Sequence, residues 1–204
     1  SSAASDVYKR QPVDGIVGEF GSINNGRLIQ AKGLEYRLAD LLKDQERTKH
    51  YDDGVFITIY LAPYNCHRIH SMVEGEIHEF SYIPGDLWTV SPLGVHHVPC
   101  LFDRNERLTT FLRTDKGECA LVKVGATVVG RIRVCYHDLA SNRSGAKNKH
   151  VLLENPFRVN RGEELGLFEL GSTVICLFPP GMIELDELKV EKKVCLGQAV
   201  GRFC

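Results

Sequence analysis

The feature that most constrains the fold is a series of short runs rich in β-branched and aromatic residues, each bounded by turn signals. The turns are marked by NNG, DDG, PGD, DKG and NRG. Runs of this composition are typical of strands. They cover residues 15–20, 55–63, 75–83, 107–114, 119–134 and 172–178. The pattern predicts a mainly β (α+β) fold with antiparallel strands.

Two short helices are also expected. Residues 36–45 carry Leu38, Leu41 and Leu42 at helical spacing. A second helix is predicted to begin after Ser91, its N-cap, with Pro92 in the first turn. The sequence has no internal repeat, and 204 residues with 43% hydrophobic content suffice for the core of a single domain.

Charge and cysteine content narrow the function classes. The 25 Lys and Arg residues balance 26 Asp and Glu residues, so nucleic acid is not expected as a partner. The seven cysteines are odd in number and form no CxxC pair. This disfavours a disulfide framework or a thiolate zinc site and favours a reducing compartment.

The sequence gives no signal for a transmembrane helix or a signal peptide. The longest uncharged run, 170–183, is too short to span a bilayer and is interrupted by Pro179 and Pro180. Residues 1–11 lack an apolar core, and DVYKRQ looks like translated sequencing-adapter DNA. We therefore expect 1–11 to be a non-native leader on a chain that lacks its natural N-terminus. A lost N-terminal membrane anchor is left open.

A basic stretch runs from Arg131 to Arg161, where seven Lys and Arg residues face only two acidic residues. Its least hydrophobic part, 136–150, is predicted to be a loop. A solvated loop is the favoured interpretation, and a patch facing anionic lipid headgroups is the alternative.

Three short motifs carry residues with catalytic chemistry: PVDG with Asp14, HRIH with His67 and His70, and LGST with Ser172. An Asp before Gly is usually a turn residue. Two histidines three residues apart on a strand point to opposite faces. A zinc site would therefore need a bend after Pro63 and a third ligand that no motif supplies. No metal is expected.

Taken together, the three motifs provide the Asp, His and Ser that can activate a hydroxyl. Gly171 directly precedes Ser172, which differs from the G-x-S-x-G elbow of serine hydrolases. A serine hydroxyl lies close to the preceding carbonyl, and glycine lets that peptide bond adopt a strained geometry. The motif indicates attack of the chain on itself.

Five blocks, in this order, resemble the bacterial and mitochondrial phosphatidylserine decarboxylase proenzymes. They are YLAPYNCHRIHSMVEG, YIPGDLWTV, LFDRNERLTTFL, VGATVVGRI and GEELGLFELGSTVICLFPPG, and QAKGLEYRLADLL adds a sixth. The resemblance runs from about Pro12 to the C-terminus. LGST in this setting resembles the self-processing site of that family.

The resemblance implies a role for each motif. Asp14 would be the carboxylate partner, His70 the general base and Ser172 the nucleophile of a serine-protease-like triad. Ser172 Oγ would attack the Gly171 carbonyl, and β-elimination and hydrolysis would leave a pyruvoyl cofactor at residue 172.

The expected catalytic domain, 12–204, would thus be cut into a β chain, 12–171, and an α chain, 172–204. The two chains would remain one interwoven domain, because the shorter one cannot bury a core alone.

The mature enzyme would convert phosphatidylserine to phosphatidylethanolamine and CO2. The pyruvoyl ketone would condense with the substrate amine and accept electrons as CO2 leaves. His67 is the candidate for proton delivery. The implied partners are phosphatidylserine in an anionic membrane, the cleaved chains themselves and a second copy in a homodimer. The implied location is peripheral, on the bacterial cytoplasmic membrane or, in a eukaryote, the mitochondrial inner membrane.

The chain departs from the family pattern at Cys66, Met72 and Val13, where tyrosine, proline and alanine are usual. None of these changes removes a reacting group, so we expect them to alter the shape of the pocket.

Two alternatives stay open. One is an inactive family member or a non-catalytic β-rich binding module, in which Ser172 never leaves the intact chain. The other is a nucleophilic site of Cys66 with a histidine. It is disfavoured because adjacent residues on a strand point apart.

Overall fold

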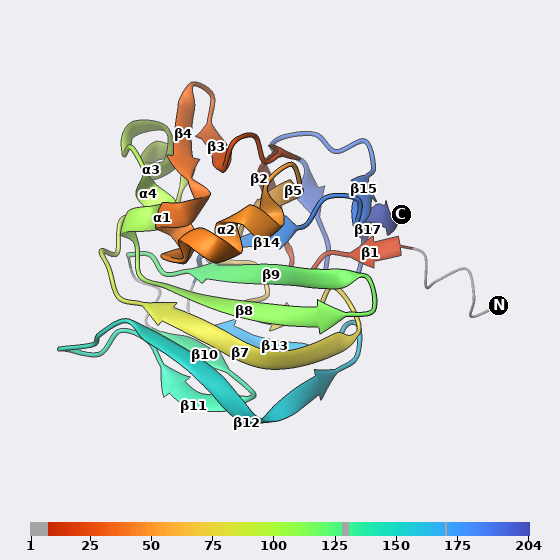
Figure 1. The fold of residues 1–204 in the computed structure, drawn as a ribbon. Helices are drawn as coiled ribbons and strands as arrows, with labels where there is room; N and C mark the ends of the chain where they lie inside the picture. The colour runs from red at the N-terminus through yellow and green to blue at the C-terminus, as the bar shows by residue number, and fades with distance from the viewer. Residues whose placement is uncertain (1–7, 128–130, 170) are drawn as a thin grey trace.

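The computed structural model describes residues 8–127, 131–169 and 171–204. Strands dominate it (Figure 1). The largest sheet has the strand order β12-β7-β8-β9-β14-β5-β2-β16, with every neighbouring pair antiparallel. Its strands are β2 (Gly15–Ser22), β5 (Val55–Tyr60), β7 (Gly75–Ile83), β8 (Arg107–Thr114), β9 (Gly117–Val124), β12 (Lys149–Val159), β14 (Thr173–Phe178) and β16 (Lys193–Val194).

Smaller sheets flank this one within the described residues. One has the order β11-β10-β13-β6, another has the order β1-β17-β15, and β3 pairs with β4. Their strands are β1 (Tyr8–Arg10), β3 (Arg27–Ala31), β4 (Leu34–Arg37), β6 (Arg68–His70), β10 (Ile132–Val134), β11 (His137–Ala140), β13 (Glu164–Phe168), β15 (Ile183–Leu185) and β17 (Ala199–Phe203). The predicted mainly β fold with antiparallel strands is confirmed.

The large sheet is covered on both faces. Successive side chains of a strand point to opposite faces of a sheet. On β8, two successive side chains contact elements that lie on opposite faces of the large sheet. The Thr110 hydroxyl lies 2.5 Å from the Tyr136 hydroxyl, beside the β10–β11 sheet. The next side chain, Phe111, lies under the guanidinium of Arg47, 3.8 Å from the ring centroid. One continuous apolar core therefore includes residues of both sheets and of the helices.

The helices of the described chain are short. They are α1 (Leu38–Leu42), α2 (Gln45–Tyr51), α3 (Pro92–His97) and α4 (Leu101–Arg104). In Figure 1, α1 and α2 lie above β9, β8 and β7, and β10 and β11 lie below these strands. None of the helices in the described part of the chain has the length and apolar character that a membrane-spanning helix needs.

The two predicted helices are present with different bounds. The first is interrupted at Lys43, whose left-handed backbone (φ 53°) ends α1, and Asp44 then caps α2. Its expected start, Tyr36, belongs to β4. The second begins as predicted after Ser91, with Pro92 in its first turn.

Residues after 171 are distributed through the fold. Strand β14 lies between β9 and β5 in the middle of the large sheet, β16 pairs with β2, and β17 pairs with β1. Residues on both sides of the 171/172 bond therefore share these sheets, and the division into two chains stays a prediction. Residues 128–130 of the run 119–134, and residues 1–7 of the expected leader, lie outside the described residues.

Candidate active site

Ser172 lies at the head of β14 and has no exposed surface. Its backbone N–H donates to the Leu61 carbonyl at 3.1 Å, and its carbonyl accepts from the Leu61 N–H at 2.7 Å. The side-chain hydroxyl donates to the carbonyl of Val124, at the end of β9. The serine is therefore held between the two strands that flank β14.

Gly171 fits a position that a side chain cannot occupy. A Cβ atom placed there would lie 2.8 Å from the Leu61 carbonyl oxygen and 3.2 Å from the Pro63 nitrogen. The first of these distances is shorter than real Cβ contacts, and both atoms belong to the backbone. The glycine that opens the apolar run is thus required by close packing against the segment after β5.

A cavity of about 190 Å³ opens beside this glycine. Its lining comes from the segments after β5 and β9 and from the loop before α3, and includes Tyr60, Pro63, Val90, Thr127 and Gly171. Burial, together with the neighbouring Tyr64, raises the pKa of Tyr60. The Tyr60 hydroxyl, which like other tyrosines is protonated near neutral pH, can donate a hydrogen bond. The acyl side of the 171/172 bond faces a space that can admit a small polar group.

His70 ends β6, opposite Glu164 of β13. Its backbone N–H donates to the Pro12 carbonyl at 2.8 Å. Its imidazole Nδ1 is buried and has no hydrogen-bond partner. A buried ring nitrogen without a partner is costly and calls for an explanation, of which a catalytic role is one.

Asp14 lies two residues after Pro12, so the structure brings its chain segment next to His70. Its Oδ1 accepts a 2.5 Å hydrogen bond from the Leu196 backbone N–H. The recorded hydrogen bonds of the Asp14, His70 and Ser172 side chains do not join them to one another. The Asp14 and His70 segments lie side by side, and the three side chains do not form a hydrogen-bonded triad in this structure.

His67 precedes β6, and its Nε2 lies 3.1 Å from the Ala62 carbonyl. Ala62 follows Leu61, the residue that pairs with Ser172, so His67 belongs to the same group of loops. Because β6 begins at Arg68, the strand alternation considered for the histidine pair does not apply to His67. Cys66 is exposed. Among the described residues no group of three His, Cys, Asp or Glu could hold a metal ion.

One buried group was missed by the sequence reading. Lys123, on β9 opposite Val174, is fully buried and donates to the Thr110 hydroxyl. Burial lowers the pKa of its amine to about 7, although nearby Cys135 and Cys176 favour the charged form. The sequence signal available was a lysine inside the apolar run 119–126.

Comparison with known proteins decides the family. The family model described as phosphatidylserine decarboxylase matches residues 4–202. The chain belongs to this family. Proteins named phosphatidylserine decarboxylase proenzyme from Anaeromyxobacter sp., Myxococcus xanthus and Brevibacillus brevis are 46%, 44% and 44% identical to it. Each match covers 93% of this chain and 68–69% of the relative, so the chain spans about two thirds of the length of those proteins.

Family membership confirms the resemblance carried by the six sequence blocks, and with it the enzyme class, a carboxy-lyase. The expected leader, 1–11, stays a prediction. The family match begins at residue 4, and Tyr8–Arg10 pair with β17 inside that stretch.

Proposed function

We propose that this chain cleaves itself between Gly171 and Ser172 and then uses the pyruvoyl group formed at residue 172 to convert phosphatidylserine to phosphatidylethanolamine and CO2. The observation that carries this proposal is the setting of the 171/172 bond. A buried serine hydroxyl lies on one side, and on the other is a glycine that packs against backbone and lines a cavity.

The proposed cleavage step begins with a movement of the Ser172 side chain. Ser172 Oγ leaves the Val124 carbonyl and attacks the Gly171 carbonyl carbon, while its proton passes to the imidazole of His70. The peptide nitrogen of Ser172 takes a proton and departs, so an ester replaces the amide. Loss of the α-proton of residue 172 then expels the Gly171 carboxylate, and water replaces nitrogen at residue 172 with release of ammonia.

Asp14 is the proposed carboxylate partner of His70. Its Oδ1 is bound to the Leu196 N–H, and its segment is anchored on the His70 backbone through Pro12. Leu196 belongs to the chain that begins at residue 172. The Asp14 contact therefore also links the two products of cleavage.

The residues around position 172 fit a pyruvoyl group. The Leu61 N–H bond to the residue 172 carbonyl does not involve the 171/172 peptide bond, so it can hold the group formed there. The neighbouring Thr173 hydroxyl is buried and has no partner, which leaves a donor beside it. A pyruvoyl group supplies a ketone that withdraws electrons as CO2 leaves. His67, held by the Ala62 carbonyl, is the candidate for delivering the proton that replaces CO2.

A bilayer surface is the proposed source of substrate. Large apolar side chains are exposed on the segments that form the cavity: Tyr64 (75%) follows Pro63, and Leu93 (69%) belongs to α3. A second cavity of about 380 Å³ shares Tyr60 and Val90 with the first, and aliphatic side chains that include Ile16, Val17 and Val95 line part of it. We assign the first cavity to the lipid headgroup and the second to apolar parts of the lipid. Peripheral association with a bacterial cytoplasmic membrane, or with the mitochondrial inner membrane in a eukaryote, follows from this assignment. A homodimer stays a prediction.

The test is the intact mass of the purified chain, denatured after incubation near neutral pH, with Ser172→Ala measured beside it. The expected result is two fragments that meet at the 171/172 bond, the C-terminal one lighter by one ammonia than its sequence. Ser172→Ala should remain whole. A single uncut wild-type mass would contradict self-cleavage and favour the binding-module alternative.

A further inference from the structure

Two irregular segments supply part of the lining of the cavity beside the 171/172 bond. Residues 89–91 lie before α3, and residues 126 and 127 follow β9. Neither segment belongs to a strand or a helix, so sheet hydrogen bonds do not fix their separation. We name residues 88–91 the first loop and residues 125–127 the second loop. A contact that joins the two loops therefore shapes this side of the cavity.

The Asn105 side chain joins the two loops and has no exposed surface. Its Oδ1 accepts from the Trp88 N–H at 3.0 Å, and its Nδ2 donates to the Trp88 and Gly125 carbonyls, both at 2.8 Å. Trp88 directly precedes the lining residue Thr89, and Gly125 directly precedes the lining residue Ala126. One side chain thus binds a backbone group at the start of each loop.

This set of contacts requires an amide. A carboxamide has one acceptor oxygen and two donor hydrogens in one plane, and both hydrogens are used here. The reverse orientation would place the oxygen against the Trp88 and Gly125 carbonyls, so only one orientation satisfies all three backbone groups. Because buried groups without partners are costly, the amide of Asn105 determines how the loops lie relative to each other.

The backbone of Asn105 is itself fixed, which allows its side chain to position other segments. Its N–H donates to the Leu101 carbonyl of α4 at 3.0 Å, and its carbonyl accepts from the Arg107 guanidinium at 2.8 Å. Arg107 is buried and also donates to two backbone carbonyls of α1. The contact between the loops is therefore anchored on two helices.

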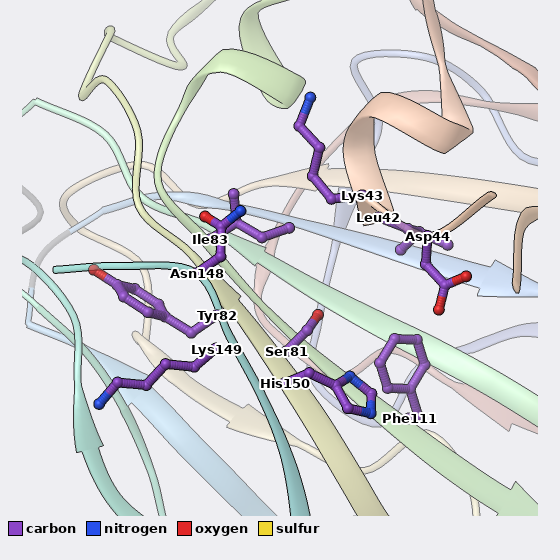
Figure 2. A pocket seen from close by; sticks show the side chains of 10 residues that line it. All are labelled: Leu42, Lys43, Asp44, Ser81, Tyr82, Ile83, Phe111, Asn148, Lys149 and His150. Atoms are coloured by element: carbon purple, nitrogen blue, oxygen red, sulfur yellow. The ribbon is translucent and has the colours of Figure 1, made fainter.

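The next residue, Glu106, anchors the same point from the other face of the sheet. Its carboxylate accepts from the Tyr82 hydroxyl and, at 2.7 Å, from the Asn142 N–H. In the close view of Figure 2, Tyr82 points away from Ser81, its neighbour on β7. The backbone carbonyl of Glu106 accepts from the Gly125 N–H at 2.7 Å. Gly125 is therefore held at its N–H by residue 106 and at its carbonyl by residue 105.

These contacts extend to the 171/172 bond. The Val124 carbonyl, which accepts from the Ser172 hydroxyl, belongs to the same peptide group as the Gly125 N–H. A shift of Gly125 would therefore move the acceptor of the Ser172 hydroxyl together with the cavity lining. We propose that Asn105 is a positioning residue that holds both loops in the arrangement needed for self-cleavage. This inference rests on the proposed function.

Asn105→Ala removes all three contacts and is the main variant. Trp88 is the only tryptophan of the sequence, so its fluorescence anisotropy reports on the mobility of the first loop. In the folded variant this anisotropy should fall, because both backbone bonds of Trp88 to the side chain are lost. Cleavage at 171/172 should slow by about tenfold or more, since a displacement of about 1 Å can cost up to about 100-fold in rate.

Leu112→Ala separates positioning from stability. Leu112 is fully buried towards the other end of β8 from Asn105, and loss of its side chain leaves a cavity that destabilises the fold. Urea unfolding measures the stability of both variants, and cleavage is compared under conditions in which both are folded. Leu112→Ala should match wild type in Trp88 anisotropy and cleavage rate. Equal slowing in the two variants would mean that Asn105 acts through stability alone and would overturn the inference.

Thr127→Val provides the test if Asn105→Ala does not fold. The Thr127 hydroxyl donates to the Leu87 carbonyl, a further bond between these segments, and Thr127 is exposed, so the fold should be retained. Cleavage should slow several-fold, less than in Asn105→Ala, because the contacts of Asn105 remain. Thr114→Val removes a similar bond, to the Gly117 carbonyl, and should cleave as wild type does. Wild-type cleavage in Thr127→Val would then overturn the inference.

The two measurements also separate this inference from the proposed function. A wild-type chain that never cleaves would contradict the proposed function. The anisotropy of Trp88 would then decide whether Asn105 holds the first loop. A lower value in Asn105→Ala than in Leu112→Ala would support the inference, and equal values would overturn it.

Discussion

The hydroxyl of Ser172 donates its hydrogen bond to the backbone carbonyl of Val124, so the proposed nucleophile is bonded to the sheet and not to a general base. Cleavage must break this bond before attack can begin. Residue 172 is nevertheless fixed by its two backbone bonds to Leu61. In the proposed cleavage the Ser172 side chain has to move, and the carbonyl that it would attack, that of Gly171, is the one next to it.

Ser172→Ala is expected to remain a single chain under conditions in which wild type is fully cut. The variant loses one buried hydrogen bond, which lowers the free energy of unfolding by about 1 kcal/mol. Gel electrophoresis and urea unfolding measure the two effects. Ser141→Ala is the control, because Ser141 is also buried and accepts from the Ile132 N–H, yet it should not affect cleavage. Efficient cleavage of Ser172→Ala would overturn the nucleophile assignment.

Gly171→Ala tests the packing argument. The added Cβ would meet the Leu61 carbonyl at 2.8 Å, so the segment after β5 must shift. Overpacking of this kind typically costs about 1–3 kcal/mol, and we expect cleavage to slow because the scissile carbonyl moves with it. In Gly18→Ala the nearest atom lies at 3.6 Å, an ordinary contact, so this control should cleave and melt like wild type. Identical behaviour of the two variants would exclude a steric reason for the glycine.

Much of the fold could be predicted from residue patterns. Strands β7 and β8 have the predicted bounds, because alternation and turn residues define both of their ends. Helix α4 was missed, since four residues carry no period that a pattern search can detect. The break between α1 and α2 depends on the left-handed backbone at Lys43. Lysine, unlike glycine, does not indicate this conformation in a sequence.

The site was less predictable than the fold. Motifs supplied Asp14, His70 and Ser172 as candidates, but the acceptor of the Ser172 hydroxyl is a backbone carbonyl 48 residues away. Sheet register, and not residue type, creates that contact. The burial of Lys123 likewise depends on the covering of both faces of β9, which no local pattern reveals.

Variants of the two histidines are expected to affect different reactions, self-cleavage for His70 and decarboxylation for His67. His70→Gln should block cleavage, because the imidazole with the unpartnered Nδ1 is the proposed base. His67→Gln should still cut itself, since glutamine can also bond to the Ala62 carbonyl, but it should decarboxylate phosphatidylserine at least 100-fold more slowly. Mass spectrometry and CO2 release measure the two steps. Loss of cleavage in His67→Gln with normal cleavage in His70→Gln would reverse the two roles.

Asp14→Asn removes a charge and keeps a hydrogen-bond acceptor for the Leu196 N–H. The fold should therefore be retained, whereas cleavage should slow by about 100-fold or more, because an amide cannot stabilise a protonated His70. Time courses of cleavage at neutral pH, with melting temperature as the control for folding, provide the test. If Asp14→Asn cleaves itself at the wild-type rate, Asp14 is not the partner of His70, and its role is limited to the contact with Leu196 that links the two chains.

Lys123 should make stability depend on pH in a definite direction. Its folded pKa of about 7 lies below the value near 10.4 of an unfolded lysine, so between these values the unfolded chain binds more protons. The free energy of unfolding therefore rises with pH across this window, by at most roughly 1.4 kcal/mol per unit. Lys123→Met removes this pH-dependent term. The free energy of unfolding of Lys123→Met should exceed that of wild type at pH 7, and the difference should shrink by pH 9.

Urea unfolding of wild type and Lys123→Met at both pH values measures this difference, and all other titrating groups cancel in the comparison. Lys192→Met, an exposed lysine, should follow the wild-type curve at a nearly constant offset. The Thr110 hydroxyl keeps its contact with Tyr136 when the lysine is lost, so no new unsatisfied group offsets the gain. Parallel pH dependences of wild type and Lys123→Met would mean that the amine reaches water in the folded protein.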